Sequence, residues 1–436
     1  MKEGWVGKKL GDTDLLKIID GDRGKNYPKQ SEFLGEGYCL FLNTKNVRPD
    51  GFNFDTTMFL DKEKDKALRK GKLNRRDVVL TTRGTIGNVA IYDDSVEFDH
   101  IRINSGMLVL RPNERIIISE YLFRILLSPV VRTQIVKHTS GAAQPQLPIK
   151  TLVNFTIPVP SLPEQRRIVS IVDQAFEGID RAIANTKKNL TNARELFDSV
   201  LCTAIFSDSD QKNWHLKTVA DVAFSKKGSI RTGPFGSQLL HGEFVDQGIA
   251  VLGIDNAVDN EFRWGKRRFI TTEKFRQLSR YKVNPGDVLI TIMGTCGRCA
   301  IVPNDIPTAI NTKHLCCITL DRGQCLPGFL HVYFLYHPIA QQFLAERAKG
   351  SIMSGLNMEI IKELPLRLPP ISKQQIIIEK VGYLSYQIRS LEAIYQQKLA
   401  ALNKLKQSIL QKAFTGELTA DTANQTTKKA EEAIAA

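Results

Sequence analysis

Apolar residues along this chain follow two different periods, and each period marks a different kind of element. Short β-branched runs, such as 77–82 and 287–292, end at glycines and predict strands that lead into tight turns. Longer apolar stretches around 118–138 and 327–348 predict buried helices. Strands mixed with helices in this way indicate an α+β module.

Two further segments, about 164–206 and 373–414, carry an apolar heptad that no proline interrupts. About 40 residues of helix at ~1.5 Å rise each would form a rod of roughly 60 Å. We expect the two helices to form an antiparallel coiled coil with each other rather than to pack separately, because pairing buries both apolar seams. The predicted coiled-coil and partner-docking residues are Ile179, Ile183, Leu190, Leu196, Ile388, Leu391, Leu402 and Leu405.

The whole pattern occurs twice along the chain. Trp5 returns as Trp214, Gln165 as Gln374 and Leu201 as Leu410, each 209 positions later. A period of this length indicates a duplicated domain, because solenoid repeats are roughly 20–50 residues long. The expected organisation, with pseudo-twofold symmetry, is a domain over 1–160, a helix over 161–209, a domain over 210–369, a helix over 370–416 and a disordered tail over 417–436.

The charge of the chain points to a polyanionic partner. The formal net charge is +14, which suggests nucleic acid or an anionic membrane surface. No apolar run reaches the ~20 residues that span a bilayer, and the N-terminus lacks the apolar stretch of a signal peptide. We therefore expect a cytoplasmic protein whose partner is nucleic acid.

One cysteine cluster resembles a metal site at first sight. Cys296 and Cys299 form a CxxC pair, and His314 follows in the same domain. In the first copy, however, Ile86 and Val89 stand where these two cysteines stand in the second. Positions that hold Ile and Val in one copy favour the core in both, where free cysteine packs as a small hydrophobe. We expect no metal site.

Sequence motifs of catalysis are absent. The chain has no GxxxxGK[ST] phosphate loop, no GxSxG elbow and no HExxH helix. Its acidic residues form no nuclease-like cluster, so we predict no catalytic residue.

Basic residues gather beside the predicted strand–turn elements, where they suit contacts to phosphates and base edges. Because the loops differ between copies while the framework repeats, we expect two different half-sites, separated by a spacer that the protein does not recognise. The candidate DNA-binding residues are Arg23, Lys25, Asn26, Lys45, Arg83, Arg102, Lys226, Arg231, Lys266, Arg267 and Lys313.

The ends of the two domains carry the most specific motifs. The segments 157–169 (IPVPSLPEQRRIV) and 368–377 (LPPISKQQII) resemble the start of the conserved spacer helix in specificity (S) subunits of type I restriction–modification systems. The segment 412–418 (KAFTGEL) resembles the end of that helix. One departure is Lys373, which stands where the first copy has Glu164.

The resemblance implies a non-catalytic subunit with two target-recognition domains, each recognising one half of a split double-stranded DNA target. The helices would set the spacer and dock two modification (methyltransferase) subunits that methylate adenine, and motor–nuclease restriction subunits would join them. S-adenosylmethionine, ATP and Mg²⁺ would be bound by those partners. Two alternatives are a specificity subunit of a combined type II methyltransferase–nuclease and a coiled-coil adaptor that does not bind DNA.

Overall fold

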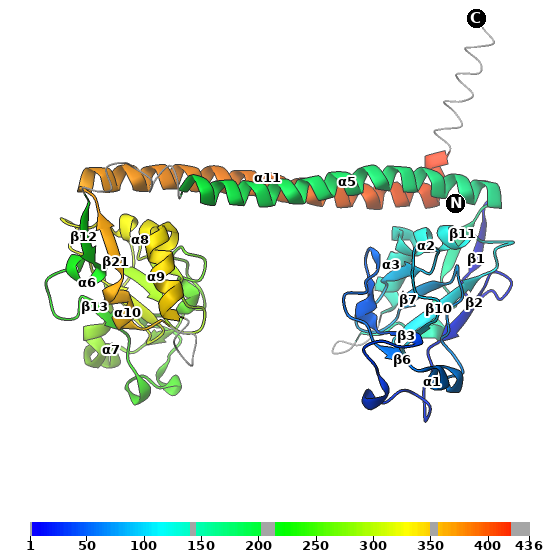
Figure 1. Ribbon diagram of the computed structural model, residues 1–436, viewed down its shortest axis with the longest axis horizontal. Helices are drawn as coiled ribbons and strands as arrows, with labels where there is room; N and C mark the ends of the chain where they lie inside the picture. The colour runs from blue at the N-terminus through cyan, green and yellow to red at the C-terminus, as the bar shows by residue number, and fades with distance from the viewer. Residues whose placement is uncertain (1, 140–144, 202–213, 349–355, 420–436) are drawn as a thin grey trace, which may run out of the picture. The chain divides into compact units, whose positions relative to one another are not determined.

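The computed structural model describes residues 2–139, 145–201, 214–348 and 356–419. The chain divides into two compact units, Met1–Thr186 with Gln396–Ala436, and Lys187–Tyr395 (Figure 1). Each unit contains one globular α+β domain and a part of each long helix. The compact units therefore do not follow the sequential division expected from the repeat, because the helices are shared between them.

The first domain is built from short strands that form two main sheets, in the orders β2-β10-β7-β8 and β6-β3-β9. Its strands are β1 (Val6–Lys9), β2 (Leu16–Asp20), β3 (Cys39–Leu42), β4 (Val47–Arg48), β5 (Gly51–Phe52), β6 (Phe59–Leu60), β7 (Val78–Thr81), β8 (Val89–Ile91), β9 (Ile101–Ile103), β10 (Met107–Pro112) and β11 (Thr156–Val159). Its helices are α1 (Lys62–Ala67), α2 (Ser119–Leu127), α3 (Pro129–His138) and α4 (Ile149–Leu152), with 3-10 turns η1 (Gln30–Glu32) and η2 (Thr44–Asn46).

The second domain repeats this plan, with sheets in the orders β13-β20-β17-β18 and β15-β14-β19-β16. Its strands are β12 (His215–Thr218), β13 (Ile230–Thr232), β14 (Ile249–Leu252), β15 (Phe269–Ile270), β16 (Lys282–Val283), β17 (Val288–Thr291), β18 (Cys299–Ile301), β19 (Ala309–Asn311), β20 (Leu315–Ile318) and β21 (Pro365–Leu368). Its helices are α6 (Val219–Val222), α7 (Thr272–Leu278), α8 (Pro327–Tyr336), α9 (Pro338–Ala348) and α10 (Met358–Glu363), with 3-10 turns η5 (Gly236–Gln238), η6 (His241–Glu243), η7 (Ile254–Asn256) and η8 (Ser279–Tyr281). The strands predicted at 77–82 and 287–292 are confirmed as β7 and β17.

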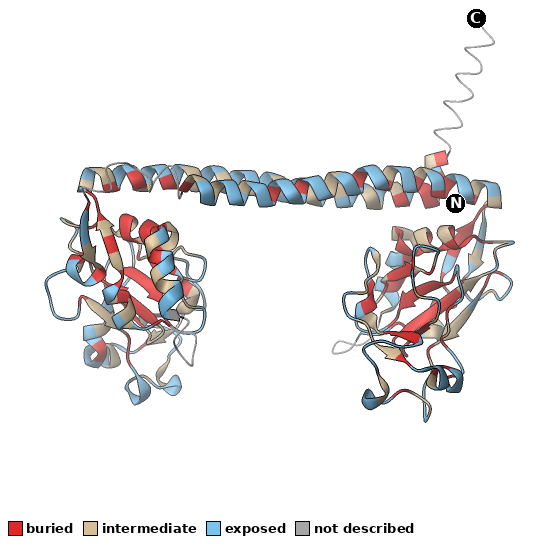
Figure 2. Ribbon diagram, in the orientation of Figure 1, coloured by how far each residue is buried: buried red, intermediate tan, exposed pale blue. Residues whose placement is uncertain are grey.

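The core of each domain lies on both faces of its central strands, which Figure 2 shows as buried. In β7, alternate residues enter different clusters: Val78 and Leu80 pack with Tyr121 of α2, whereas Val79 packs with residues of β3. Because both faces are covered, the strand is a continuous apolar run rather than an alternating one.

The two predicted buried helices are each broken in two. Ser128 separates α2 from α3, and its backbone is extended, with φ −75° and ψ 157°. His337 separates α8 from α9 in the same way. The reason is Pro129 and Pro338, because proline lacks an N–H group and keeps the preceding residue out of the helical region. The prediction of helices in these stretches is confirmed, and each stretch holds two of them.

A matched glutamine fixes the start of each long helix, α5 (Leu162–Val200) and α11 (Ile371–Thr415), to its own domain. Gln165 is fully buried; its Oε1 accepts from the N–H of Ile118 at 3.0 Å and its Nε2 donates to Ile116 O at 2.8 Å. Gln374 makes the same pair of bonds with Leu326 N and Gln324 O, both at 2.8 Å. This explains why the pair recurs in the repeat.

The two helices run antiparallel within each unit. In the first unit Phe414 packs against Tyr121 with ring centroids 5.2 Å apart, and Lys406 pairs with Asp180 further along. In the second unit Arg194 Nε lies 2.5 Å from Glu392 Oε1.

The predicted coiled-coil and partner-docking residues differ in burial. Ile179 and Leu190 are buried, and Ile183, Ile388 and Leu402 are half-buried. Leu196, Leu391 and Leu405 are exposed, at 65%, 36% and 47%. An α-helix drifts by ~20° per heptad from a strict seven-residue repeat, so leucines chosen at fixed spacing leave the interface of a long pair.

Two further predictions concern where the long helices end and where the disordered tail begins. Residues 202–206 of the first predicted long helix lie outside the described residues. The disordered tail was predicted from Glu417, but Glu417 to Thr419 are helical and Thr419 is buried; residues 420–436 lie outside the described residues. Among the described helices, none combines the length and the apolar character that a bilayer span requires.

Candidate nucleic-acid interface

A pair of parallel strands places the candidate loops of each domain at one edge. Leu42 of β3 lies beside Ile103 of β9, and Leu252 of β14 lies beside Asn311 of β19. Because the strands are parallel, their carboxyl ends meet at the same edge, where the 3-10 turn η2 or η7 follows one strand and a loop follows the other. Side chains from these two segments are therefore brought together.

A buried asparagine fixes the 3-10 turn at this edge in both domains. Asn46 donates from Nδ2 to Asn53 O at 3.0 Å and accepts at Oδ1 from the N–H of Asn43 at 3.0 Å. Asn256 donates to Arg263 O at 2.9 Å and accepts from the N–H of Gly253 at 2.9 Å. In the first domain the residue before this asparagine is Lys45, which the turn holds at its tip.

A glycine turn beside this edge is built identically in the two domains. Thr81 Oγ1 accepts from the N–H of Asn88 at 2.9 Å, and Thr291 Oγ1 accepts from the N–H of Arg298 at 2.8 Å. Gly84 and Gly294 follow with φ of +70° and +73°, which favours glycine. Arg83 stands directly before Gly84 and is exposed.

Most of the predicted basic residues are accessible. Arg23, Lys25, Lys45, Arg83, Lys226, Lys266 and Arg267 are exposed, and Asn26 and Lys313 are half-buried. Asn26 is partly engaged, because its Nδ2 donates to Ala67 O at 3.2 Å. The Arg267 guanidinium lies 5.3 Å from the Trp264 ring centroid, which orients it without removing its charge.

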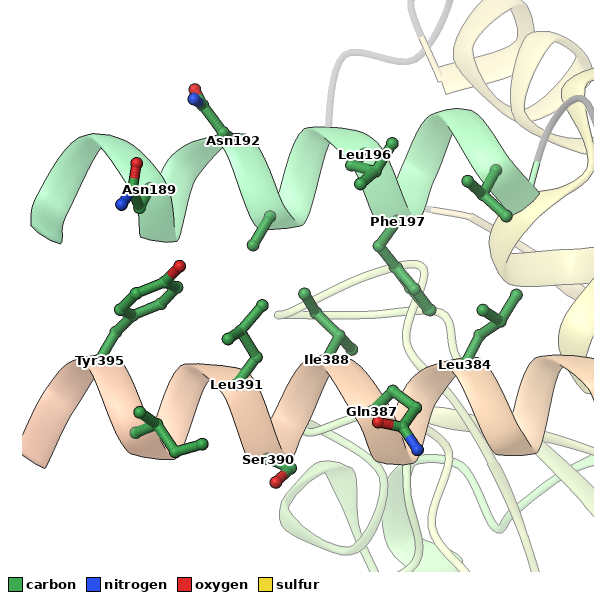
Figure 3. A pocket seen from close by; sticks show the side chains of 13 residues that line it. Asn189, Asn192, Leu196, Phe197, Leu384, Gln387, Ile388, Ser390, Leu391 and Tyr395 are labelled. Atoms are coloured by element: carbon green, nitrogen blue, oxygen red, sulfur yellow. The ribbon is translucent and has the colours of Figure 1, made fainter. Parts of the chain in front are cut away.

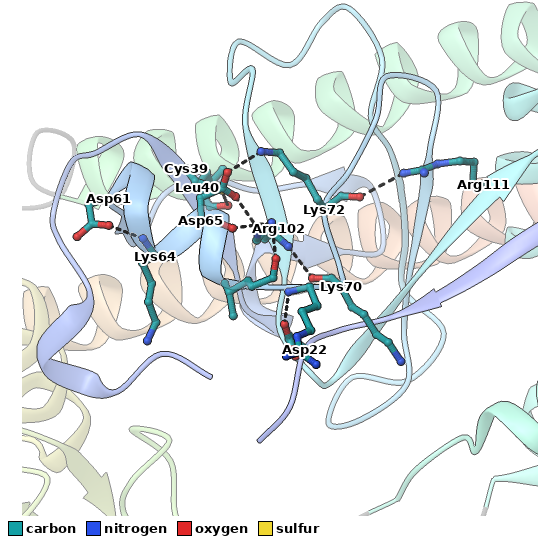
Figure 4. Close-up of polar contacts among 12 residues, drawn as sticks. Asp22, Cys39, Leu40, Asp61, Lys64, Asp65, Lys70, Lys72, Arg102 and Arg111 are labelled. Atoms are coloured by element: carbon teal, nitrogen blue, oxygen red, sulfur yellow. Dashed lines mark hydrogen bonds and ion pairs between the residues drawn. The ribbon is translucent and has the colours of Figure 1, made fainter. Parts of the chain in front are cut away.

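Arg102 is a correction to the predicted interface, because its side chain is buried. It lies in β9, where its Nε donates to Asp65 Oδ1 at 2.6 Å (Figure 4). Its other nitrogens donate to the carbonyls of Lys70, Asp65 and Leu68 at 2.7 to 3.0 Å. Burial would raise the pKa of Asp65, but hydrogen bonds from Lys72 and Arg102 lower it overall. Arg102 therefore holds α1 and the following loop instead of contacting DNA.

Arg231 is a second correction. Its side chain is 10% exposed, and its Nη2 lies 2.6 Å from Asp287 Oδ2. The same guanidinium donates to Lys282 O at 2.6 Å and to Thr319 Oγ1 at 3.0 Å. A buried carboxylate such as that of Asp287 requires a charged partner. Arg231 is that partner, so its charge is not available to a phosphate.

The structure groups the accessible candidates into cavities, each with residues that the candidate set omitted. Arg23, Lys25 and Asn26 share a cavity with Arg69 and Lys70. Lys226 shares one with Lys227, Arg280 and Tyr281. Lys266 and Arg267 share one with Asp255, Arg268 and His314. Three of these omitted residues had a signal in the sequence, because Arg69 and Lys70 lie in a basic cluster before β7 and Arg268 lies in one before β15.

His314 lies at the edge in the second domain. Burial lowers its pKa below the ordinary value, and the positive charges of Lys313 and Arg268 lower it further. The imidazole is therefore mainly neutral near pH 7, where it offers one donor and one acceptor nitrogen.

The cysteines of the second domain belong to its core. Cys299 is fully buried, as Val89 is in the first domain, and burial raises the pKa of its thiol. Cys296 is half-buried and packs against the same core, as Ile86 does. Within the described part of the chain, no group of three or more His, Cys, Asp or Glu side chains is arranged to hold a metal ion.

A groove on the helix pair of the second unit is the candidate partner surface (Figure 3). Phe197 of α5 points toward Leu384 and Ile388 of α11, and Leu196 also lines the groove. Two of the three exposed leucines among the predicted coiled-coil and docking residues, Leu196 and Leu391, line this groove.

Comparisons with known proteins agree with one another. The family model for the "Type I restriction modification DNA specificity domain" matches the chain twice, over residues 2–192 and 212–401. The specificity subunit of the type I restriction enzyme EcoKI from Escherichia coli K12 is 24% identical over 443 residues, covering 96% of this chain and 90% of that protein. The EcoBI specificity subunit from Escherichia coli is 28% identical over 298 residues, and there the match spans 62% of the relative's length.

Two solved structures share the fold. A chain from a type I restriction–modification system, solved in a study of complex assembly and conformational transition, has a TM-score of 0.74 at 19% identity and covers 96% of this chain and 99% of its own. The HsdS subunit from Thermoanaerobacter tengcongensis has a TM-score of 0.52 at 18% identity and covers 96% and 98%.

Proposed function

Because the chain belongs to the family of type I restriction modification DNA specificity domains, we propose that it selects the DNA sequence on which its partner subunits act. Each domain recognises one half of an asymmetric, bipartite target. The observation that carries this proposal is that the two domains repeat the same backbone framework, including the hydrogen bonds of Asn46 and Asn256. The exposed side chains at matched positions nevertheless differ. Two equal frameworks with unequal surfaces suit two different half-sites.

The accessible charge supports DNA as the ligand. The net charge is +14, and each domain has a cavity lined by basic side chains, with Arg69 and Lys70 in one and Lys226 and Arg280 in the other. Binding that neutralises several phosphates releases counterions, so affinity should fall steeply as salt rises. An adaptor that does not bind DNA would lack this dependence.

The chemistry belongs to partners in this proposal. Two modification subunits dock on the helices and methylate adenine, and motor–nuclease subunits cut unmodified DNA. These partners bind S-adenosylmethionine, ATP and Mg²⁺. The groove lined by Leu196 and Leu391 supports a docking role, since it leaves large apolar side chains in solvent.

The long helices set the spacer between the half-sites. This part of the proposal rests on the family and on the length of α5 and α11, 39 and 45 residues. Deleting one heptad from α11 should change the accepted spacer, or abolish assembly, without changing the bases of either half-site. A change in the bases of either half-site would contradict the proposal that the helices set the spacer length.

The decisive experiment maps methylated adenine in the host genome by single-molecule sequencing, with and without this gene. We expect one bipartite motif to disappear when the gene is deleted and to return on complementation. If the map is unchanged, purification of the complex with its partner subunits and a salt titration of DNA binding follow. No binding, or binding that does not depend on salt, would refute the proposal.

A further inference from the structure

Five matched positions surround the edge formed by the parallel strands, and the contacts of the backbone identify them. Asn104 and Thr312 match, because their N–H groups donate to Leu42 O at 3.0 Å and to Leu252 O at 2.9 Å. Lys45 and Asp255 match as the middle residues of η2 and η7. The remaining three pairs are Thr44 with Ile254, Arg83 with Met293, and Gly106 with His314.

The five positions lie together in the first domain. A Cβ atom on Gly106 would lie 3.0 Å from Thr44 Cγ2, 3.2 Å from Asn104 Oδ1 and 3.8 Å from Arg83 Cβ. Three segments that are distant in the sequence thus converge at Gly106, with Lys45 next to Thr44.

The same segments converge in the second domain. A Cβ atom on Gly294 would lie 3.0 Å from Ile254 Cδ1. Asp255, Thr312 and His314 line one cavity with Ile254. We call these five positions of each domain its variable edge.

The backbone hydrogen bonds of the edge are shared by the two domains, yet every side chain differs. Lys45 is replaced by Asp255, Arg83 by Met293 and Gly106 by His314. A donor-rich set thus stands opposite a set with an acidic, an apolar and an imidazole side chain, in which Asp255 Oδ1 already accepts from Arg268 Nη2 at 2.9 Å. Lysine and arginine suit guanine, an acidic oxygen suits the amino group of cytosine, and an apolar side chain suits the thymine methyl group.

Another pair of matched positions, outside the variable edge, carries the same charge in both domains. Lys72 and Lys282 match, because they lie across from Arg102 and Ile310, which correspond in register. Two residues earlier, Lys70 and Arg280 are both basic and exposed, and each lines the basic cavity of its domain. Equal charge at matched positions suits the DNA backbone, which is the same in every sequence.

We propose that the variable edge of each domain recognises the bases of its half-site, with Arg83 and Met293 as matched specificity-determining residues, while Lys70 and Arg280 contact the backbone. This inference rests on the proposed function. Arg83 and Lys45 are suited to this role, since neither side chain forms an ion pair or a side-chain hydrogen bond within the described residues.

The test exchanges the matched residues in the intact system, with its partner subunits, and maps methylated adenine. Arg83→Met should reduce discrimination at one base pair of one half-site by roughly 10-fold to 100-fold. Met293→Arg should change the other half-site only. Both side chains are exposed, so the fold tolerates the exchange.

Two controls separate recognition from charge. Arg115→Met removes an exposed arginine beyond the far end of β10 and should leave the motif unchanged. Lys70→Ala and Arg280→Ala should weaken binding equally for all sequences and lower the salt dependence.

The outcomes distinguish this inference from the proposed function. If the unaltered protein directs methylation to a bipartite motif but both exchanges leave that motif intact, the variable edge is refuted and the function stands. A uniform loss of binding in Arg83→Met without a change of motif also refutes it. If the unaltered protein directs no bipartite motif, the proposed function itself fails.

Discussion

The two domains solve one packing problem with opposite chemistry. In the first, Asp65 of α1 and Arg102 of β9 form a buried ion pair. At the matched positions of the second, Phe275 of α7 and Ile310 of β19 belong to one apolar cluster. The correspondence follows from register, since Arg102 lies beside Phe41 and Ile310 beside Val251. The fold therefore requires that this space be filled, by either kind of pair.

The difference teaches what a buried charge contributes here. An ion pair loses hydration when it is buried, so an apolar pair of similar volume is often as stable or more stable. Breaking the pair is different, because the remaining charge stays buried without the partner that compensated its lost hydration. The comparison predicts that exchanging both residues is tolerated and that exchanging one is not.

The largest expected effect is therefore on the first domain. Arg102→Ala should lower the free energy of unfolding by about 3–5 kcal/mol, because Asp65 would stay buried with only Lys72 as a charged partner. The double variant Asp65→Phe with Arg102→Ile should recover most of that loss. Urea unfolding of the intact chain, with far-ultraviolet circular dichroism, measures both. A double variant as unstable as Arg102→Ala would refute the equivalence.

A second buried carboxylate sharpens the comparison. Asp77 is paired with Arg111 of β10, whereas Asp287 is paired with Arg231 of β13, so the guanidinium comes from different strands. Arg231 is the less exposed, at 10% against 31%. We expect Arg231→Leu to cost about 3 kcal/mol and Arg111→Leu about 1–2 kcal/mol. Equal losses in urea unfolding would show that exposure does not govern these pairs.

Acidification should lower the stability of the second domain. Burial lowers the pKa values of His331 and His337, the latter to about 4 from 6.5. As the pH falls below 6.5, these histidines become protonated in the unfolded chain but stay neutral in the folded one. The free energy of unfolding therefore declines until about pH 4. The loss of stability from His337 is about 3 kcal/mol once the pH has fallen below about 4.

Hydrogen exchange at several pH values, corrected for intrinsic rates, locates this loss. Peptides from α8 should lose protection between pH 6.5 and 4.5, and His337→Gln should reduce that loss. If α2 of the first domain loses as much protection as α8, and the variant changes nothing, the histidines are not responsible.

The smallest effects are expected at the exposed ion pairs of the helices. Arg194 pairs with Glu392 in the second unit, and Lys406 pairs with Asp180 in the first. Arg194→Ala and Lys406→Ala should each cost less than about 1 kcal/mol, and less still at high salt. Thermal unfolding at two salt concentrations tests this, and a larger loss for Lys406→Ala would identify its contact with the Phe176 ring as the additional contribution.

The sequence predicted what repeats and what is periodic. The duplicated domains follow from residues that recur 209 positions later, and the strands β7 and β17 and the long helices follow from hydrophobic spacing. Arg102 could not be placed, because it lies between two isoleucines in a strand whose three residues are all buried, and burial depends on which strands are neighbours. The burial of Leu405 could not be predicted for another reason, since a fixed heptad does not show which apolar side chains of a long helix face the other helix. The variable edge joins three segments that only the sheet order brings together.

The first unit is completed by residues from the far end of the chain. Lys2 Nζ lies 3.1 Å from Glu164 Oε1, which accepts from Thr419 Oγ1 at 2.6 Å, and Phe414 packs in the first core. On a ribosome that adds roughly 5–20 residues per second, the stretch Lys187–Tyr395 takes about 10–40 s to emerge. During that time the nascent first domain exposes the surface that Phe414 will cover, so synthesis itself creates an interval in which a chaperone or a partner subunit can bind first.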